Sequence, residues 1–585
     1  AYNSKILSLR AGDSSGTLYD SALINAYSGA ISKGAKVINN SWGVDTFSAA
    51  GGSKLLEART NDIISVFAAG NDGLSNPGYY ALTPNVSGYE ALADSLIAVV
   101  ATDSNNTIAT FSNECGVAKN WCMAAPGADV YSTVDIDDNN SSTNYGTMSG
   151  TSQSAPHVSG AAAILRSKWP SKTAAEIVTI LYDTATDLGD VGTDTIYGRG
   201  LLNLDNAIYA QGVLSVFTLP GVSYLLSDSS LSVSSMLGDS LNQSLSSAVF
   251  DKYKRDYYYD LNTRVQEPAV VSMLDELLYG DSSIFVDIEP GVRLLSEVGK
   301  GSVQIQYDYE GLKFSFSHKQ APNQIFGLNN QTNLVGLSDQ YSIYSDSHLS
   351  QIDNASIINI VNSGDITTSL GVISGYIEPD NKHSIDGVNL SFSIKPIQNL
   401  SLLAQLSHLE EKDTFLSSYF SGAYKTGASN TNAINLTSQA KFTDGLSLFA
   451  QYNKGQTKVS SLTDSVVSNV STIDSEGYSL SLIKNGLYSE NDTLFATFKQ
   501  PLRVISGDVI LKTANGLNMD DSISFTEQAI GLSPTGTEQA LTLGYLTDHN
   551  KDTAMIFLLN YRDNPNHNSS TKSENQVMIK MTKKF

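Results

Sequence analysis

From residue 285 to residue 585 the chain alternates apolar and polar residues in short runs, and polar turns separate these runs. Residues 302–309 read Ser-Val-Gln-Ile-Gln-Tyr-Asp-Tyr, and the alternation resumes at residues 312–318 after a Glu-Gly turn. Similar runs occupy residues 388–394, 400–409, 433–442, 446–452, 478–482, 494–498, 509–512, 540–545, 554–561 and 577–585. A period of two places successive side chains on opposite faces of a strand, whereas a helix requires a period near 3.6. The region is therefore predicted to be an all-β antiparallel domain.

Alternation also suits a sandwich or a solvated β-solenoid. The length of the region and its few cysteines and prolines favour a transmembrane β-barrel, whose strands of about ten residues have one apolar and one polar face. Roughly twelve strands would fit. The last run resembles the final strand of bacterial outer-membrane proteins, with apolar Val577, Ile579 and Met581. The chain ends on Phe585, as those proteins end on an aromatic residue, although Lys583 departs from the pattern. This resemblance implies outer-membrane lipid and the barrel-assembly machinery as partners.

The N-terminal part of the chain contains a candidate nucleophile. Residues 150–157 read Gly-Thr-Ser-Gln-Ser-Ala-Pro-His and lead into small residues, which predicts a buried helix starting near Ser152. The Ser152 hydroxyl would then lie at the positive end of the helix dipole, and Pro156 is expected in the first turn. A serine becomes a nucleophile when a base takes its proton, usually a histidine held by a carboxylate. His157 is the first histidine of the chain. It lies one turn along the same helix and is poorly placed to act as that base.

Three segments together resemble the subtilisin-like serine proteases. Residues 150–157 resemble the nucleophile segment, residues 36–43 the strand and loop that pair with a bound peptide, and residues 63–71 the next strand. The resemblance assigns Ser152 as the nucleophile and Asn71 as the side-chain donor to the oxyanion, helped by the Ser152 N–H. Without it, Asn71-Asp72-Gly73 would be interpreted as an ordinary turn. The residues that it implies for substrate binding are Ser41, Trp42, Gly43, Ala69 and Gly70.

In these proteases the catalytic aspartate and histidine precede the serine. Residues 1–10 resemble the strand that follows the catalytic histidine, and no initiator methionine precedes them. We therefore expect an N-terminally truncated domain that is essentially inactive, because loss of the histidine costs roughly 10⁶ in turnover. The alternative is a pseudoprotease that binds peptides without cutting them, on the same barrel anchor.

The two cysteines, Cys115 and Cys122, are close in sequence. They could be reduced thiols, but subtilisin-like proteases of bacterial cell surfaces often carry a cysteine pair here, which favours a disulfide and an oxidising compartment. A metal site at these cysteines is not expected, because no other soft ligand is near, and no cofactor is expected. The net charge of −23 argues against nucleic acid as a partner.

Three parts follow from these patterns. Residues 1–211 alternate strands and helices, which predicts a subtilisin-like α/β domain with a mostly parallel sheet. Residues 212–284 are interpreted as a β-rich junction and residues 285–585 as the barrel. Residues 499–504 and 531–536 also resemble the barrel region of subtilisin-like autotransporters. The expected function is a serine endopeptidase that cuts proteins or peptides, exported or anchored by its own barrel in the bacterial outer membrane. A second alternative is a secreted protease with a soluble β-rich accessory domain.

Overall fold

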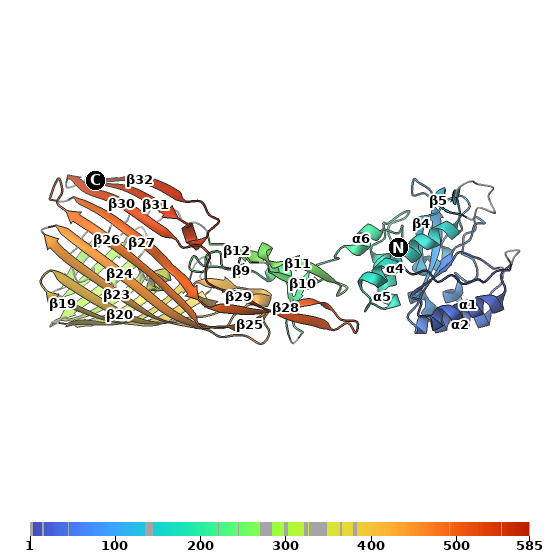
Figure 1. Cartoon of the computed structure of the whole chain (residues 1–585), viewed down its shortest axis with the longest axis horizontal. Coiled ribbons are helices and arrows are strands. Elements are labelled where there is room, and N and C mark those ends of the chain that lie inside the picture. The colour runs from blue at the N-terminus through green and yellow to red at the C-terminus, as the bar shows by residue number, and fades with distance from the viewer. Residues whose placement is uncertain are drawn as a thin grey trace. The chain divides into compact units, whose positions relative to one another are not determined.

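The chain forms two compact units. The first contains Ala1–Leu214, Phe250–Tyr257 and Gly516–Ser524, and the second contains Ser215–Val249, Tyr258–Asn515 and Phe525–Phe585. Sequence analysis did not predict that the two later segments belong to the first unit. Phe585 and residues 269–282 of the expected junction lie outside the described residues. The computed structural model (Figure 1) describes residues 4–13, 17–44, 46–134, 144–219, 221–243, 245–268, 283–289, 291–297, 302–320, 326, 348–362, 366–377, 383–443, 445–490, 492–550 and 553–583.

The first unit is built on a parallel four-stranded sheet, in the order β1 (Val37–Asn40), β2 (Ile64–Ala68), β3 (Leu96–Thr102) and β4 (Cys122–Pro126). All three strand pairs are parallel, which confirms the α/β prediction. An antiparallel hairpin of β5 (Val130–Thr133) and β6 (Tyr145–Met148) accompanies it. The helices are α1 (Asp20–Ser32), α2 (Ala49–Thr60), α4 (Thr151–Lys168), α5 (Ala174–Asp183) and α6 (Leu204–Ile208), with 3₁₀ turns η1 (Thr83–Asn85), η2 (Glu90–Asp94) and η3 (Gly116–Trp121).

Both faces of this sheet are covered. Along β2, Ile64 and Val66 point into one core with residues of α4 and α5, whereas Phe67 points into a second core with residues of α1 and α2. This is why β3, with the sequence Leu-Ile-Ala-Val-Val-Ala-Thr, is buried along its whole length and shows no alternation. The small residues Ala155, Ala161 and Ala162 let α4 lie close against the strands.

An ion pair holds the last turn of α4. The Arg166 guanidinium, almost fully buried, hydrogen-bonds the carboxylate and the carbonyl of Asp62. Desolvation raises the pKa of Asp62, but the hydrogen bonds from Arg166 and from the Ala174 N–H, with the charges of Arg166 and Lys36, outweigh it. The net pKa of Asp62 is therefore lowered, and the carboxylate is charged at neutral pH.

The second unit is dominated by one large sheet in which every recorded strand pair is antiparallel. The described residues place fifteen strands in it, so the expected count of about twelve is not confirmed. In order, with β13 and β32 at the two ends, the strands are β13 (Ser283–Glu289), β14 (Val292–Glu297), β15 (Ser302–Tyr309), β16 (Leu312–Gln320), β17 (Asp353–Asn362), β18 (Ile366–Ile377), β19 (His383–Ile397), β20 (Leu400–Glu411), β23 (Ser429–Thr443), β24 (Leu446–Val459), β26 (Ile473–Asn485), β27 (Thr493–Ser506), β30 (Gln539–Asn550), β31 (Thr553–Asp563) and β32 (Glu574–Lys583).

The large sheet is strongly curved (Figure 1). His348, just before β17, is buried and hydrogen-bonds the hydroxyl of Ser475 in β26 at 2.8 Å, although five strands separate β17 from β26 in the sheet order. Phe326, also buried, packs with Ile373, Ile385 and other residues of β17–β20. Phe326 and His348, which lie between β16 and β17 in the sequence, therefore pack against the inner face of the sheet.

The described residues also form three smaller sheets. The first contains β11 (Asp256–Asp260), β10 (Ser246–Phe250), β7 (Ser215–Phe217) and β8 (Ser223–Leu225); the second contains β12 (Val265–Gln266), β9 (Leu231–Ser232), β22 (Ser418–Phe420) and β21 (Thr414–Phe415); and the third contains β25 (Val467–Val470), β28 (Asp508–Leu517) and β29 (Ile523–Gly531). Further 3₁₀ turns in the described part of the chain are η4 (Leu226–Asp228), η5 (Leu261–Arg264), η7 (His348–Gln351), η8 (Gly422–Tyr424) and η9 (Pro565–His567). Among the described residues no helix combines the length and the apolar character needed to cross a membrane.

The start of α5 supplies a stability test. Thr173 Oγ1 accepts a hydrogen bond from the Glu176 N–H, and the Glu176 carboxylate accepts one from the Thr173 N–H at 2.8 Å, forming a capping box. Thr173→Ala should lower the free energy of unfolding by about 1 kcal/mol, because helix N–H groups lose their acceptor. Urea unfolding followed by tryptophan fluorescence measures this in the first unit alone, since all three tryptophans lie there.

The matched control is Thr179→Ala on the same helix. The Thr179 hydroxyl donates to the Ala175 carbonyl within the helix and caps nothing. Its loss should change the free energy of unfolding by less than about 0.5 kcal/mol. Equal unfolding midpoints for the two variants would contradict the role of the capping box.

Candidate active site

The N-terminus of α4 carries the candidate nucleophile. The helix begins at Thr151, next to the predicted start, with Gly150 as its N-cap, so half-buried Ser152 lies in the first turn. N–H groups of the first turn have no helical acceptor. The N–H of Thr151 is taken by Asn71 Oδ1, while that of Ser152 is a donor that the helix itself leaves free for a ligand.

Ser41 and Ser152 form a reciprocal pair. The Ser41 hydroxyl donates to the Ser152 carbonyl at 2.7 Å, and the Ser152 hydroxyl donates to the Ser41 carbonyl at 3.3 Å. The prediction that Pro156 falls in the first turn is wrong, because the helix starts at Thr151 and Pro156 lies in the second turn. Proline has no N–H, so the Ser152 carbonyl, four residues earlier, has no helical donor. Ser41, just after β1, supplies the missing hydrogen bond.

Asn71 lies just after β2 and is held by the same helix terminus. Its Oδ1 accepts from the Thr151 N–H at 2.8 Å and from the Thr151 hydroxyl at 3.0 Å. Thr151 is fully buried, and its Oγ1 accepts in turn from the Gly70 N–H at 3.1 Å. Because a backbone N–H can only donate, the oxygen of the Asn71 amide must face Thr151, and Nδ2 faces the other way. Among the described residues Nδ2 has no hydrogen-bond acceptor, so it is available to an anionic oxygen.

Gly150 allows the Asn71 amide to lie close to the start of the helix. A Cβ at this position would lie 3.3 Å from Asn71 Nδ2 and 2.8 Å from Gln153 Oε1. Any side chain here would crowd both groups. The flexible Gln153 side chain can move away, but the Asn71 amide is held by Thr151, so glycine at this position preserves the close approach of Asn71 to the helix.

The five residues predicted for substrate binding do not all face the same way. Ser41 and Gly70 contact Ser152 and Thr151, as described, and Gly43 is exposed. Trp42 packs edge-on against Phe67 at 5.4 Å and Tyr80 at 5.3 Å, in the second core. Ala69 is fully buried there, and its carbonyl accepts from Gly78 N and Asn113 Nδ2. The residues next to the serine are thus mainly Ser41, Gly70, Asn71 and Thr151.

Asn113 positions this site and was missed as a site residue by sequence analysis. Its Nδ2 donates to the Ala69 carbonyl at 3.0 Å, and its Oδ1 accepts from the N–H groups of Asp72 and Leu74 at 3.1 and 2.9 Å. The side chain thereby holds the turn that carries Asn71. The signal in the sequence was indirect, since the turn after residue 71 needs acceptors for its N–H groups. Nothing local to Asn113 identifies it as the supplier.

A base for Ser152 is not among the described residues. The Ser152 hydroxyl has one recorded hydrogen-bond partner within them, the Ser41 carbonyl. His157 is exposed, and its Nδ1 lies 2.9 Å from the Gln153 carbonyl of its own helix. Within the described residues no group of three or more His, Cys, Asp or Glu side chains is placed to hold a metal ion.

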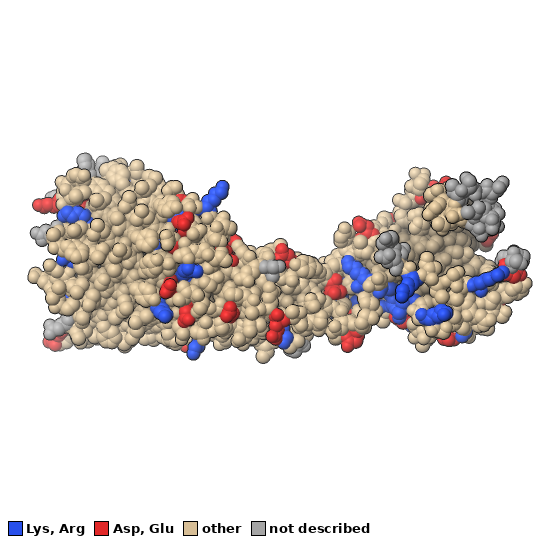
Figure 2. All heavy atoms as spheres, viewed as in Figure 1, with Lys and Arg blue, Asp and Glu red and all other residues tan. Residues whose placement is uncertain are grey.

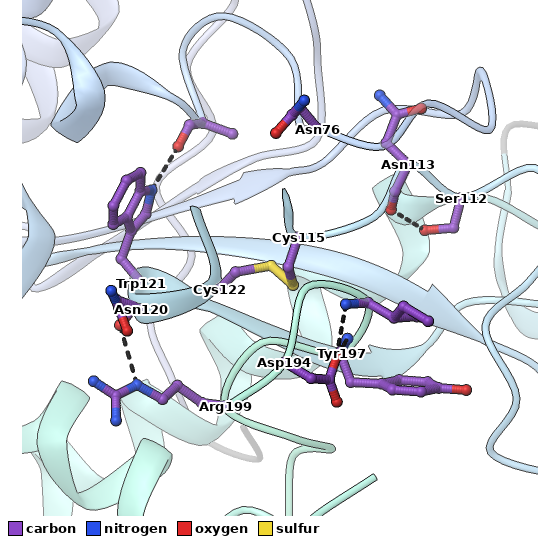
Figure 3. Close-up of a disulfide and its surroundings, with 12 residues drawn as sticks. Asn76, Ser112, Asn113, Cys115, Asn120, Trp121, Cys122, Asp194, Tyr197 and Arg199 are labelled. Atoms are coloured by element: carbon purple, nitrogen blue, oxygen red, sulfur yellow. Dashed lines mark hydrogen bonds between the residues drawn. A yellow bond between two sulfur atoms is a disulfide. The ribbon is translucent and has the colours of Figure 1, made fainter. Parts of the chain in front are cut away.

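Cys115 and Cys122 form a disulfide whose Cα atoms are 5.7 Å apart, and both residues are fully buried (Figure 3). It closes the short loop that contains η3 and joins the start of β4 to the segment that carries Asn113. Figure 3 shows Asp194, Tyr197 and Arg199 beside it. Arg199 N donates to the Cys122 carbonyl at 2.8 Å. The disulfide thus supports the framework of the site from a position where it does not contact Ser152.

Part of the chain is similar to known proteins. The model of the Peptidase_S8 family, described as the subtilase family, matches residues 1–200. The chain is 40% identical to Serotype-specific antigen 1 of Mannheimia haemolytica over 156 residues, which are 26% of this chain and 16% of that protein. It is 38% identical to Subtilisin DY of Bacillus licheniformis over 207 residues, 35% of this chain and 69% of that protein. It is 34% identical to an extracellular serine protease of Serratia marcescens over 173 residues, 27% of this chain and 16% of that protein.

Removal of the disulfide tests its structural role. The double variant Cys115→Ala/Cys122→Ala should lose about 2 kcal/mol of unfolding free energy in the first unit, because a short closed loop no longer limits the unfolded chain. Tryptophan fluorescence during urea unfolding measures the change. Reductant added to the unfolded parent protein should shift its refolding midpoint to that of the double variant, and should leave the variant unchanged. A parent midpoint that is insensitive to this reduction would contradict the prediction.

Proposed function

Since the chain belongs to the subtilase family of serine peptidases, we propose that it is part of a serine endopeptidase in which Ser152 is the nucleophile. The observation that carries the proposal is the arrangement at the start of α4. There the Ser152 hydroxyl and N–H lie at a helix N-terminus, and the Nδ2 of Asn71 is held beside it by Thr151. A nucleophile beside two aligned donors is the arrangement that acyl transfer requires.

The proposed chemistry uses these groups in sequence. Ser152 Oγ attacks the carbonyl carbon of the scissile peptide bond, and its proton passes to a base that later protonates the leaving amine. The carbonyl oxygen becomes an oxyanion, which accepts hydrogen bonds from Asn71 Nδ2 and from the Ser152 N–H. Water then hydrolyses the acyl-serine ester and restores the Ser152 hydroxyl.

The substrate is proposed to be an extended peptide. β1 lies at the edge of its sheet, and Ser41, Trp42 and Gly43 follow it directly. A peptide can add main-chain hydrogen bonds to such an edge, with its scissile bond near Ser152. Ala69 and Trp42 are directed into the core. We propose that they support the wall of the pocket for a substrate side chain, and that Gly70 forms the part of this wall that the substrate contacts.

The proposed mechanism requires a base for Ser152 that is not among the described residues. We propose that the 585-residue chain alone turns over peptides negligibly, since among the described residues the Ser152 hydroxyl has only a carbonyl partner. The same observation favours a second candidate, a pseudoprotease that binds peptides without cutting them. A complete reading frame without a histidine and an aspartate of the subtilase type would favour the pseudoprotease.

The large sheet of the second unit supports an outer-membrane β-barrel. Its two faces have the opposite polarity to those of a water-soluble domain. In β26, Leu480 and Leu482 are each 48% exposed, whereas Ser479 and Ser481 between them are buried. The same inversion recurs in β19, where Val388 and Phe392 are exposed and Asn389 and Ser391 are buried.

This polarity matches a bilayer as the surrounding solvent. Large continuous apolar surfaces are rare on soluble monomers, whereas a barrel presents its apolar face to lipid and its polar face to the interior. Figure 2 shows that on the visible face of the large sheet Lys, Arg, Asp and Glu gather toward the two ends and leave a zone largely without charge between them. Strands such as β17, with 10 residues, and β31, with 11, are long enough to cross a tilted span. A closed barrel additionally requires β13 to pair with β32, and this pairing is part of the proposal.

The proposed architecture is thus an autotransporter: a peptidase domain at residues 1–211, a β-rich junction at 212–284 and a barrel at 285–585. The peptidase would act at the bacterial cell surface or after secretion. Its partners would be protein or peptide substrates, outer-membrane lipid and the barrel-assembly machinery.

Active-site labelling tests the catalytic proposal. The product of the complete reading frame should react with a fluorophosphonate probe, and Ser152→Ala should abolish the reaction. Asn71→Ala should lower kcat by about 10²–10³ with little change in KM, because an oxyanion donor acts mainly in the transition state. Ser154→Ala is the matched control, since this hydroxyl donates to the Ala125 carbonyl in the core. Labelling that survives Ser152→Ala, or an Asn71→Ala enzyme with unchanged kcat, would refute the assignment.

A charge on the outer face tests the barrel. Leu480 lies near the middle of β26 between Ala450 and Phe498 on the neighbouring strands. Leu480→Arg should destabilise the barrel in detergent or bilayers by about 2–4 kcal/mol, and should reduce the fraction with heat-modifiable migration in SDS. Leu480→Ala, the control, should keep that fraction. If Leu480→Arg behaved like Leu480→Ala and the region partitioned into buffer, a soluble accessory domain would replace the barrel.

A further inference from the structure

Two segments from later in the chain are integral parts of the first unit. We call Phe250–Tyr257 and Gly516–Ser524 the docking segments. They contact one side of the domain, formed by the end of α4, by α5 and by the residues after α6. Arg255 of the first segment and Lys172, which the second segment contacts, are buried, and these contacts are separate from the candidate active site.

Arg255 is the centre of the first docking segment and is fully buried. Its guanidinium binds the equally buried carboxylate of Asp251, with Nε and Nη2 at 2.9 and 2.7 Å from Oδ2. Its remaining donors reach the carbonyls of Ala207 and, at 2.9 Å, Tyr209. The guanidinium also lies 4.5 Å from the ring centroid of Trp169, at the end of α4. Such a group is tolerated in a core only when its charge and its donors are paired, as they are here.

Aromatic side chains of the same segment extend the core. The ring of Tyr257 lies 5.6 Å from that of Trp169, and both Tyr253 and Tyr257 pack against the first core of the domain. The Tyr253 hydroxyl donates to Asp183 at 2.7 Å, at the end of α5. The backbone joins too, since Lys252 N donates to the Gln211 carbonyl at 3.0 Å.

The second docking segment contributes Asp521. Its carboxylate lies 3.1 Å from Lys172 Nζ and accepts from the Ser171 hydroxyl at 3.1 Å. The Lys172 side chain is 1% exposed, and its ammonium group forms ion pairs with Asp521 and with Glu176, the latter at 3.3 Å. Leu517 N donates to Asp256 at 3.4 Å, which links the two docking segments to each other.

We propose that the docking segments keep residues 1–214 bound to the rest of the chain without a covalent connection. The peptide chain connects residues 1–214 to the later part of the chain between Leu214 and Ser215. Buried arginine, tryptophan and tyrosine contacts of this kind are those that dominate stable protein interfaces. A cut in the connection would therefore leave the peptidase domain attached to the segments that hold it. This goes beyond the proposed function, because it needs neither catalysis nor a membrane.

The experiment cuts the connection on purpose. A recognition sequence for a site-specific protease is inserted after Val213, which is 70% exposed and precedes β7. The purified 585-residue chain carries a tag on its C-terminal side and is cleaved in detergent. In a native pull-down, the N-terminal fragment should remain with the tagged remainder. The double variant Arg255→Ala/Asp521→Ala should reduce the retained fraction about tenfold.

The matched control changes an ion pair on the same hairpin outside the docking segments. Lys512 of β28 and Glu527 of β29 form this pair at 3.0 Å, and the double variant Lys512→Ala/Glu527→Ala should retain the fragment fully. Asp521→Asn alone alters a half-exposed carboxylate that is not in the core, and it should release the fragment several-fold faster than the parent. Tryptophan fluorescence of each uncut variant verifies that the first unit is folded.

Two results would overturn the proposal. The first is separation of the parent fragments as soon as the chain is cut under native conditions. The second is retention by Asp521→Asn and by the double variant that equals retention by the parent. Neither result bears on labelling of Ser152, so a failure here is distinguishable from a failure of the proposed function.

Discussion

The first unit depends on the burial of one helix, α4, against a sheet whose strand ends meet its N-terminus. Asn71 and Ser41 follow two neighbouring parallel strands. Asn71 accepts a hydrogen bond from the Thr151 N–H and Ser41 donates one to the Ser152 carbonyl, and the helix itself can supply neither partner. At the other end Arg166 pairs with Asp62, and Trp169 lies against Arg255. Because both ends are held, the position of Ser152 follows from packing along the whole helix and not from its loop alone.

The two units place their apolar side chains in opposite ways. In the first, apolar side chains of β2 and β3 are enclosed on both faces, as in a protein that folds in water. In the large sheet the buried face is rich in Ser, Thr, Asn and Gln, and the exposed face is apolar. Strict alternation makes this inversion possible, since a strand can reverse the polarity of its faces without a change of backbone geometry. One chain therefore contains both kinds of surface.

The accuracy of the sequence predictions varied with the range of the interactions. The parallel sheet was predicted correctly, since the prediction depends on a repeated pattern of strands and helices along the chain. Pro156 was placed one turn too early, because the donor that makes it tolerable, Ser41, comes from a distant strand. The role of Asn113 was missed for the same reason. The expected count of twelve strands came from the length of the region and an average strand spacing, which do not identify individual hairpins.

By itself the sequence determined the kinds of structure: a period of two for antiparallel strands, short apolar runs for buried parallel strands, and the Gly-Thr-Ser segment that leads into a helix. These follow from local backbone geometry and side-chain periodicity. Only the tertiary structure decided which groups meet at Ser152, and that Phe250–Tyr257 and Gly516–Ser524 complete the first unit. Such contacts join residues far apart in the chain. Their hydrogen bonds and buried charges become favourable only after the surrounding core has formed.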